Sequence, residues 1–410
     1  MRQIILINVS GADKPGLTSS IADILSREQI QILDIGQAVI HDTLSLGILV
    51  EVPAGAESSP VLKDVLFRTH ELGMQARFTP IDEASYMAWV AGQGKPRHII
   101  TLLARKLSAK HLARTTSIIS RYNMNIDRIE RLSGRVPLGE LPPDSKACIE
   151  ISARGPLEDP AAMRRELLKI AVEMDVDIAY QEDNVFRRNR RLFAFDMDST
   201  LIAAEVIDEL AAAAGVGPEV AAITERAMRG EIDFAESFAT RVALLEGLDA
   251  SLLEQIAADL PLSEGAERLV STVRKLGYKT AILSGGFTYF GHYLQRRLGI
   301  DYVFANELEI VDGKVTGKVS GQVVDGQRKA ELLRQLAAEE NILLDQVIAV
   351  GDGANDLPML SIAGLGIAFR AKPIVKESAR HSISTLGLDG ILYLLGYSDR
   401  ETSEQLVAGD

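Results

Sequence analysis

Two pairs of carboxylates each follow a short apolar run of the sequence. Asp196 and Asp198 come directly after the run Leu192–Phe195, and Asp352 and Asp356 follow a second such run. Carboxylates at the ends of buried strands are costly unless a cation or hydrogen bonds hold them. We therefore expect both pairs to meet at one edge of a parallel sheet. Oxygen ligands of this kind predict a site for Mg²⁺, which also bridges to the phosphate of a substrate.

Two further predicted elements carry groups suited to binding phosphate. Ser284 and Gly285 come after the apolar run Thr280–Leu283, and a hydroxyl beside exposed backbone N–H groups suits a phosphate oxygen. Lys329 lies near the start of a predicted helix and offers a point charge to the same anion. Each motif alone often occurs as an ordinary turn or a solvated charge. Together and in this order, they predict phosphate chemistry assisted by a cation.

Taken in order, these motifs resemble those of the haloacid-dehalogenase superfamily of phosphatases. Residues 196–200 read DMDST, residues 284–286 read SGG, and residues 351–356 read GDGAND, with Lys329 before the last. Within that superfamily, the segments EVID at 205–208, AMRG at 227–230 and FAESF at 234–238 resemble phosphoserine phosphatases. The resemblance implies Mg²⁺-dependent hydrolysis of O-phospho-L-serine to L-serine and phosphate, the last step of serine biosynthesis, through an aspartyl-phosphate intermediate.

The resemblance also implies a role for each residue. Asp196 is expected to be the nucleophile, and Asp198 the general acid and base. Ser284, Gly285 and Lys329 are expected to hold the phosphoryl oxygens. The expected catalytic residues are thus Asp196, Asp198, Ser284 and Lys329. The expected Mg²⁺ ligands are the Asp196 side chain, the Asp198 backbone carbonyl and Asp352, with Asn355 and Asp356 in support and Asn355 also beside the substrate.

Four residues after the first motif are expected to bind the rest of the substrate. By the same resemblance, Glu205 takes its ammonium group and Arg241 takes its carboxylate through a bidentate fork. Met228 and Phe234 are expected to wall the pocket. The residues alone also permit plainer interpretations, because Glu205 and Arg241 could be solvated helix charges and the other two ordinary core residues.

The elements that must position these residues predict a doubly wound, Rossmann-like α/β domain. From residue 184 to 400, short apolar strands alternate with helices, and such folds place active-site loops at the carboxyl ends of the strands. A stretch of helical pattern at about 203–275 separates the first two strands and is expected to form a cap over the site. The segment Ile310–Val324 predicts a β-hairpin that turns at Asp312 and Gly313.

The first half of the chain predicts two ferredoxin-like domains, at residues 1–84 and 97–183, each with the element order β-α-β-β-α-β. Residues 12–17, ADKPGL, resemble the ACT domain, a small-molecule sensor often joined to amino-acid enzymes. This resemblance implies an amino acid as effector, and L-serine is the expected one. Asp13 and Gly16 are its expected contacts, because N–H groups at a helix start can receive a carboxylate. The second domain lacks the Pro-Gly pair. Unpaired edge strands of these sheets favour a homodimer.

Composition narrows the possible partners and location. A formal net charge of −13 argues against nucleic acid, and the lack of a long apolar run argues against a membrane span and for the cytoplasm. The single cysteine, Cys148, cannot form an intramolecular disulfide and is expected to be buried in a strand. The basic run Arg187–Arg191 is interpreted as a solvated linker, with docking onto another domain as the alternative.

Two other functions stay open on the sequence alone. The enzyme could act on a related small phosphate or on phosphorylated protein side chains, although a protein side chain offers no free ammonium or carboxylate to Glu205 and Arg241. The chain could instead be an amino-acid-sensing protein with an inert phosphatase domain. The joint presence of Asp196, Asp198, Lys329 and Asp352 argues against that second alternative.

Overall fold

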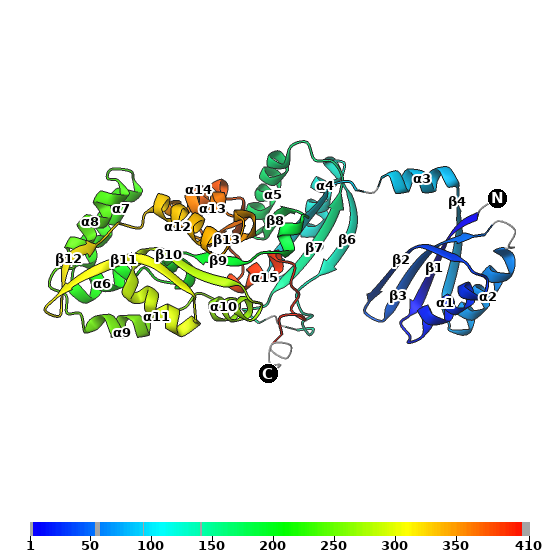
Figure 1. The fold of residues 1–410 in the computed structure, drawn as a ribbon, viewed down its shortest axis with the longest axis horizontal. Coiled ribbons are helices and arrows are strands. Elements are labelled where there is room, and N and C mark those ends of the chain that lie inside the picture. The colour runs from blue at the N-terminus through cyan, green and yellow to red at the C-terminus, as the bar shows by residue number, and fades with distance from the viewer. Residues whose placement is uncertain (1–2, 54–57, 93, 140–141, 404–410) are drawn as a thin grey trace. The chain divides into compact units, whose positions relative to one another are not determined.

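The chain divides into two compact units, Met1–Lys95 and Pro96–Asp410. The computed structural model describes residues 3–53, 58–92, 94–139 and 142–403, and within them all side chains except those of Ser58, Ser59, Met228 and Phe234. Among these residues no helix has both the length and the apolar character needed to cross a membrane. Figure 1 labels the elements of both units, and each unit is described by itself.

The first unit is an antiparallel sheet in the order β2-β3-β1-β4, with two helices on one face (Figure 1). On β1, Ile5, Ile7 and Val9 alternate with more exposed residues and pack beneath α1 and α2. The first six elements follow one another as β-α-β-β-α-β, which confirms the predicted order. Helix α3, which comes after them, was not predicted from the sequence. The elements are β1 (Gln3–Ala12), α1 (Leu17–Arg27), β2 (Gln31–Ile40), β3 (Thr43–Val52), α2 (Ser58–Glu71), β4 (Gln75–Ile81) and α3 (Glu83–Ala91).

The second unit begins with the same topology, in a sheet ordered β6-β7-β5-β8. Here the central strand is buried on both faces, because every residue from His98 to Ala104 is inaccessible to solvent. One face packs under helices of the same small domain, and the other, through Leu103 and Cys148, joins the core of the large domain that follows. The elements are β5 (Arg97–Ala104), α4 (Ala109–Arg121), β6 (Asn125–Arg131), β7 (Ala147–Arg154), α5 (Pro160–Met174) and β8 (Asp177–Glu182).

The large domain is built on a seven-stranded sheet in the order β12-β11-β10-β9-β13-β14-β15. All neighbouring pairs are parallel except β11 and β12, which form the predicted hairpin. Asp312 and Gly313 turn this hairpin with positive φ angles of 50° and 76°. The strands are β9 (Leu192–Phe195), β10 (Lys279–Phe287), β11 (Tyr302–Val311), β12 (Lys314–Ser320), β13 (Val347–Gly351), β14 (Leu365–Phe369) and β15 (His381–Ile383).

Helices cover both faces of this sheet, which confirms the doubly wound fold (Figure 1). Leu192 and Ala194 of β9 face α12 (Gly326–Glu339) and α13 (Leu357–Ile362). Phe193 and Phe195 face the opposite side, with α10 (Ala266–Lys275) and α11 (Thr288–Leu298). Strand β9 is therefore apolar along its whole length, as a central parallel strand must be. Two shorter helices, α14 (Pro373–Ser378) and α15 (Ile391–Leu394), follow.

Four helices form an insertion between β9 and α10. Its two linkers run antiparallel, because Ile202 pairs with Leu262 and the Ala203 N–H donates to the Pro261 carbonyl at 2.9 Å. The insertion thus begins and ends beside the loop that follows β9. Its helices are α6 (Val206–Ala214), α7 (Gly217–Met228), α8 (Phe234–Ala243) and α9 (Leu252–Asp259). We call these four helices the cap.

Buried polar contacts join the second small domain to the large domain. The Asp177 carboxylate, at the start of β8, accepts hydrogen bonds from the Ser384 N–H (2.9 Å), the Thr385 N–H (2.8 Å) and the Thr385 hydroxyl (2.6 Å). The Nε2 atom of His381, on β15, lies 2.8 Å from the Tyr180 carbonyl oxygen. Because these groups are buried, the two domains pack as one body and not as beads on a flexible linker.

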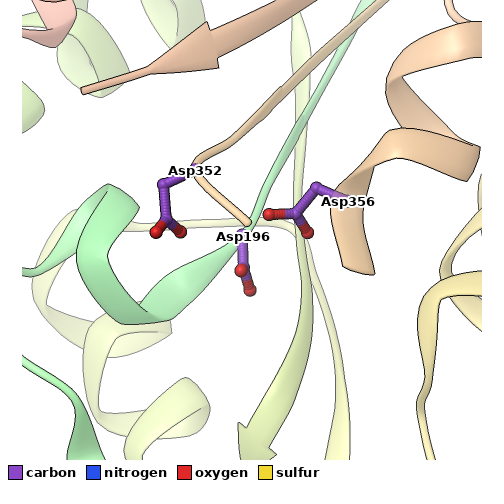
Figure 2. Close-up of side chains that lie close together, drawn as sticks. All are labelled: Asp196, Asp352 and Asp356. Atoms are coloured by element: carbon purple, nitrogen blue, oxygen red, sulfur yellow. The ribbon is translucent and has the colours of Figure 1, made fainter. Parts of the chain in front are cut away.

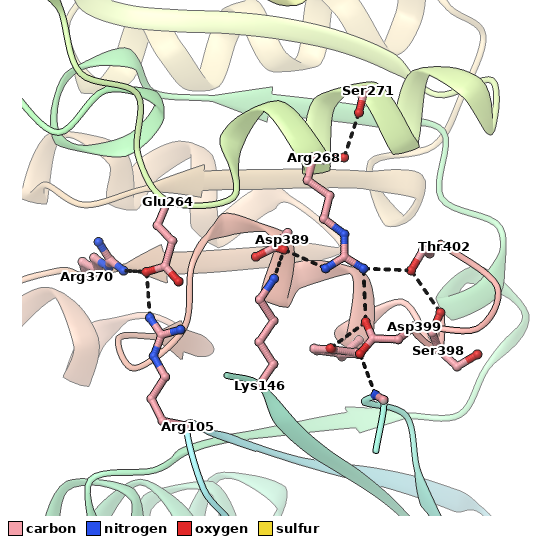
Figure 3. A network of polar contacts seen from close by, with 12 residues as sticks. Arg105, Lys146, Glu264, Arg268, Ser271, Arg370, Asp389, Ser398, Asp399 and Thr402 are labelled. Carbon is pink, nitrogen blue, oxygen red and sulfur yellow. Dashed lines mark hydrogen bonds and ion pairs between the residues drawn. The ribbon is translucent and has the colours of Figure 1, made fainter. Parts of the chain in front are cut away.

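Ion pairs extend this contact toward the cap (Figure 3). Arg105 of the second small domain pairs with Glu264 at 2.7 Å, directly after the linker by which the chain leaves the cap. Asp389 is paired with both Lys146 and Arg268, and Arg268 reaches Asp399 at 3.1 Å. The returning linker of the cap is therefore in direct contact with the second small domain.

The basic run at residues 187–191 is not a solvated linker, as we had interpreted it. Arg187 is only 1% exposed and pairs with Glu150 of the second small domain. Arg190 is also buried and donates to the Asp345 carbonyl. The run thus docks between domains, which was the less favoured alternative. The prediction for Cys148 is confirmed, because it is a buried free thiol on β7.

The contacts of Asp177 predict a stability effect. Asp177→Ala leaves three partly buried donors without an acceptor, so we expect it to lower the free energy of unfolding of the second unit by about 2–3 kcal/mol. Urea unfolding of the full chain, followed by circular dichroism, measures the change. Asp144→Ala is the matched control, since Asp144 is exposed in the same small domain. Equal stability of the two variants would show that the Asp177 contacts contribute nothing.

Candidate active site

Three neighbouring strands bring the motifs together. Strand β9 lies between β10 and β13 in the sheet, and all three are parallel. Their carboxyl ends therefore place the loop at Asp196, the loop at Ser284 and the loop at Asp352 side by side. From β9 the chain adds β10 to β12 on one side of the sheet and β13 to β15 on the other, so the strand order reverses between β9 and β13. Open α/β sheets bind ligands in the crevice at such a reversal.

Lys329 lies between two of the carboxylates. Its ammonium is 2.9 Å from Asp196 and 2.7 Å from Asp356, and Lys329 and Asp356 are completely buried. Burial acts to lower the pKa of Lys329, but the charges of Asp196 and Asp356 outweigh it and raise that pKa above its ordinary value. Lys329 is thus a permanent cation that orients both carboxylates.

Three carboxylates gather at this edge, as Figure 2 shows. Asp196, Asp352 and Asp356 each offer one oxygen, and these atoms lie within 4.8 Å of one another. Burial, with the negative charges of Asp196 and Asp356, raises the pKa of Asp352 to about 8. Burial and the charge of Asp196 raise the pKa of Asp356 to about 7. The raised pKa values show that ionising all three carboxylates together is costly without a cation. Oxygen donors of this kind suit a hard divalent cation, so they fit Mg²⁺.

Asp198 points away from this cluster, toward the cap. Its Oδ1 accepts from the Val206 N–H at 2.9 Å, at the start of α6. Ser199 follows with a left-handed φ of 54°, which turns the chain sharply after the two aspartates. Burial, then the charges of Glu205 and Asp196, raise the pKa of Asp198 well above its ordinary value. A carboxyl group that favours its protonated form is suited to act as a general acid.

Glycines allow the loops to approach closely. A Cβ at Gly286 would lie 2.5 Å from the Asp198 carboxylate, and one at Gly351 would lie 2.4 Å from Asp356. Any side chain at either position would displace an aspartate. The Ser284 hydroxyl, completely buried, accepts from the Gly286 N–H at 2.9 Å. In the third loop, the Gly353 N–H donates to Asp356 at 2.9 Å, and the Asn355 side chain lies over Gly353.

The expected substrate-reading residues lie in and beside the cap. Glu205 accepts from the Ser199 hydroxyl at 2.6 Å, at the point where the β9 loop meets α6. Arg241 on α8 is half-buried, and its long contacts reach the Ser237 carbonyl (3.4 Å) and the Thr224 hydroxyl (3.5 Å). Burial lowers the pKa of Arg241, while the charge of Glu205 opposes this shift. The side chains of Met228 and Phe234 lie outside the described part of the structure.

One residue near the site was missed by the sequence analysis. Asn306 on β11 is 2% exposed, and its side chain bonds to Gly285 and Val324 at 2.8 Å each. A lone asparagine in a strand carries no motif. The available signal was a polar residue directly after the apolar run at residues 302–305, since a buried amide is unfavourable unless it is hydrogen-bonded.

Comparison with known families covers each domain in turn. Residues 3–79 and 96–181 match ACT domains, and residues 193–361 match the haloacid dehalogenase-like hydrolases. A solved structure of a probable phosphoserine phosphatase from Vibrio cholerae aligns with a TM-score of 0.58 at 35% identity, covering 75% of this chain and 88% of that one. These matches confirm the expected fold of all three domains.

Full-length relatives extend the match along nearly the whole chain. A phosphoserine phosphatase of Streptomyces coelicolor is 40% identical over 99% of this chain and 94% of its own length. One from Mycobacterium tuberculosis is 40% identical over 99% of this chain and 96% of its own length. The chain belongs to the phosphoserine phosphatase family. The alignment with both relatives spans the two ACT domains and the hydrolase domain of this chain.

The first ACT domain has a pocket beside the start of its first helix. Gly16 begins α1 in a left-handed conformation, with φ of 88°, and Asp13 precedes it in the same loop. This turn exposes the first N–H groups of the helix toward the pocket. The pocket is lined by Asp13, Lys14, Gly16, Thr18, Gln37 and Leu44, among others.

The position of Lys329 predicts a large loss of stability on its removal. Lys329→Met keeps much of the side-chain volume but leaves Asp196 and Asp356 buried without their cation, which typically costs about 3–5 kcal/mol. Denaturant unfolding measures the loss. Lys279→Met is the control, because the Lys279 side chain is 46% exposed and 3.8 Å from its nearest acid. If Lys329→Met is as stable as this control, the ammonium does not hold the cluster together.

Proposed function

We propose that the protein is a Mg²⁺-dependent phosphoserine phosphatase that hydrolyses O-phospho-L-serine to L-serine and phosphate through an aspartyl-phosphate intermediate. The observation that carries this proposal is the buried Lys329 ammonium 2.9 Å from Asp196, beside two further carboxylates. That arrangement orients Asp196 beside a group of carboxylates that could hold a cation. Membership of the phosphoserine phosphatase family supports the choice of substrate.

In the proposed mechanism, Asp196 attacks phosphorus and the serine oxygen leaves. Asp198 gives its proton to that oxygen and then takes a proton from the water that hydrolyses the aspartyl-phosphate. Ser284, the Gly285 backbone and Lys329 bind the phosphoryl oxygens throughout, so that catalysis consists largely of positioning and charge stabilisation. The raised pKa of Asp198 supports its role as acid.

The proposed Mg²⁺ ligands are the side chains of Asp196 and Asp352 and the backbone carbonyl of Asp198. Asp356 and Asn355 would orient these ligands, and Asn355 would also face the substrate. When bound, Mg²⁺ neutralises charge on the phosphoryl oxygens. The crowding of Asp196, Asp352 and Asp356 supports this assignment, because a divalent cation relieves it.

Recognition of the serine part is proposed to lie with the cap. Glu205 would bind the ammonium and Arg241 the carboxylate, with Met228 and Phe234 as walls of the pocket. The position of Glu205 at the start of α6 and the half-buried state of Arg241 support these roles. A phosphorylated protein side chain has neither free group, so the site favours the free amino acid.

We further propose that an amino acid, most simply L-serine, regulates the enzyme at the first ACT domain. Asp13 would take its ammonium group, and the N–H groups at the start of α1 beside Gly16 its carboxylate. The pocket at these residues supports the site. We propose a homodimer as well, because β2 is an edge strand of ten residues with none of them buried.

The first test of the proposed function is phosphate release from O-phospho-L-serine. We expect release in the presence of Mg²⁺, its loss on addition of EDTA, and its return when Mg²⁺ is restored. A serine phosphopeptide of matched concentration should be hydrolysed far more slowly. Cleavage of an aryl phosphate without cleavage of phosphoserine would retain the chemistry and overturn the substrate.

Arg241 offers a test of how the substrate is read. Arg241→Ala removes a charge-assisted fork to the carboxylate, so kcat/KM for phosphoserine should fall about 100-fold. The rate with an aryl phosphate, which has no such carboxylate, should change little. Arg229→Ala, at an exposed position of the cap, is the control. Equal losses on both substrates would mean that Arg241 does not bind the carboxylate.

Regulation at the first ACT domain is tested with Asp13→Ala. We expect L-serine to reduce phosphate release by the unchanged enzyme at concentrations well below those that inhibit as product. The variant should lose this response while its kcat/KM in the absence of L-serine stays the same. Calorimetry that finds a single serine site per chain, in the active site only, would contradict the proposal.

A further inference from the structure

Asn306 is buried between two loops that the proposed mechanism uses. It lies on β11, beside the carboxyl end of β10, and is only 2% exposed. Its side chain contacts neither the acidic cluster nor the proposed metal ligands through any hydrogen bond of the described residues. Its role must therefore come from the two backbone groups that it does bind.

Those two groups fix the orientation of the amide. The Asn306 Nδ2 donates to the carbonyl of Gly285 at 2.8 Å, and its Oδ1 accepts from the N–H of Val324 at 2.8 Å. A carbonyl can only accept and an N–H can only donate, so the reversed amide would lose both bonds. Among the described residues, Asn306 is the side chain that hydrogen-bonds to both of these segments.

At one end, Asn306 satisfies a carbonyl that the sheet leaves unpaired. The parallel register between β10 and β11 is interrupted between Leu283 and Phe287, and resumes with Phe287 opposite Asn306. Gly285 lies within this interruption. A buried backbone carbonyl without a ladder partner is costly, and the Asn306 amide supplies the missing donor.

At the other end, Asn306 holds the entry to α12. Val324 immediately precedes Asp325, which caps α12 by accepting from the Arg328 N–H at 2.8 Å. Lys329 follows in the first turn of the same helix. The position of Val324 therefore governs where the Lys329 side chain begins.

We propose that Asn306 is a positioning residue that clamps the Ser284–Gly286 loop to the start of α12. It thereby sets the separation between the two groups that bind the phosphoryl oxygens, the Ser284–Gly285 loop and the Lys329 ammonium. This inference rests on the proposed roles of those groups in phosphate binding.

No other side chain can take this place. Aspartate would keep the acceptor for Val324 but set a carboxylate oxygen against the Gly285 carbonyl. Leucine has a similar volume and offers neither bond. Glutamine carries both groups on a longer stem, which would force the loop and the helix apart.

Asn306→Asp tests the clamp. Misplacement of a catalytic group by about 1 Å can cost on the order of 100-fold in rate, so we expect kcat/KM for phosphoserine to fall roughly 10- to 100-fold. Inhibition by inorganic phosphate, which reports on the phosphoryl-binding groups alone, should weaken about tenfold. The decisive readout is therefore the phosphate inhibition constant, which a general loss of stability does not change.

Leu308→Ala is the matched control, because Leu308 is a buried residue on the same strand that contacts neither loop in the hydrogen-bond network. It should lower stability and leave phosphate inhibition unchanged. Unaltered phosphate inhibition in folded Asn306→Asp, or an equal weakening in Leu308→Ala, would overturn the proposal.

If Asn306→Asp does not fold, Asn306→Ser carries the same comparison, since its hydroxyl can reach at most one of the two partners. Should the unchanged protein cleave an aryl phosphate but not phosphoserine, the proposed substrate fails, and phosphate inhibition of aryl phosphate cleavage still decides the role of Asn306.

Discussion

A single buried cation determines how the site is built. The Lys329 ammonium lies out of reach of water between Asp196 and Asp356, and these carboxylates balance its charge. With Asp352 beside them, three acids face one lysine, and the cluster keeps an excess of negative charge. Burial, together with this excess of negative charge, raises the pKa values of Asp352 and Asp356, and a divalent cation or protons would relieve the excess. The three carboxylates thus suit a metal, and Lys329 holds one of them, the proposed nucleophile Asp196, in place.

The central sheet positions this cluster, and the cap is attached beside it. Central strands β9, β10 and β13 deliver the three loops, and glycines at 286 and 351 permit their close approach. The cap, in contrast, is joined through two short linkers that meet at Ile202 and Leu262. The second linker leads directly to Glu264, which pairs with Arg105 of the second ACT domain. The chain that leaves the cap is therefore in contact with that ACT domain.

The sequence was informative wherever chemistry is local. The strands, the loops that follow them and the hairpin at Asp312 were predicted because apolar runs, glycines and paired acids reveal themselves within a few residues. Pairings between residues far apart in the sequence were not predicted. Arg187 looked like a solvated charge because its partner, Glu150, lies in another domain, and nothing near Asp177 or Asn306 indicates the backbone groups that they bind. Helix α3 was also missed, since its residues show no amphipathic period and none of them is buried.

The central claim is that Asp196 carries the phosphoryl group, and acid quenching during turnover tests it most directly. The enzyme is mixed with excess O-phospho-L-serine and Mg²⁺, quenched within a few turnovers, digested, and analysed by mass spectrometry. The account predicts a phosphorylated peptide containing Asp196, and no phosphate on the corresponding peptide of Asp196→Asn. Full turnover with no phosphorylated peptide, or with phosphate on a different residue, would contradict it.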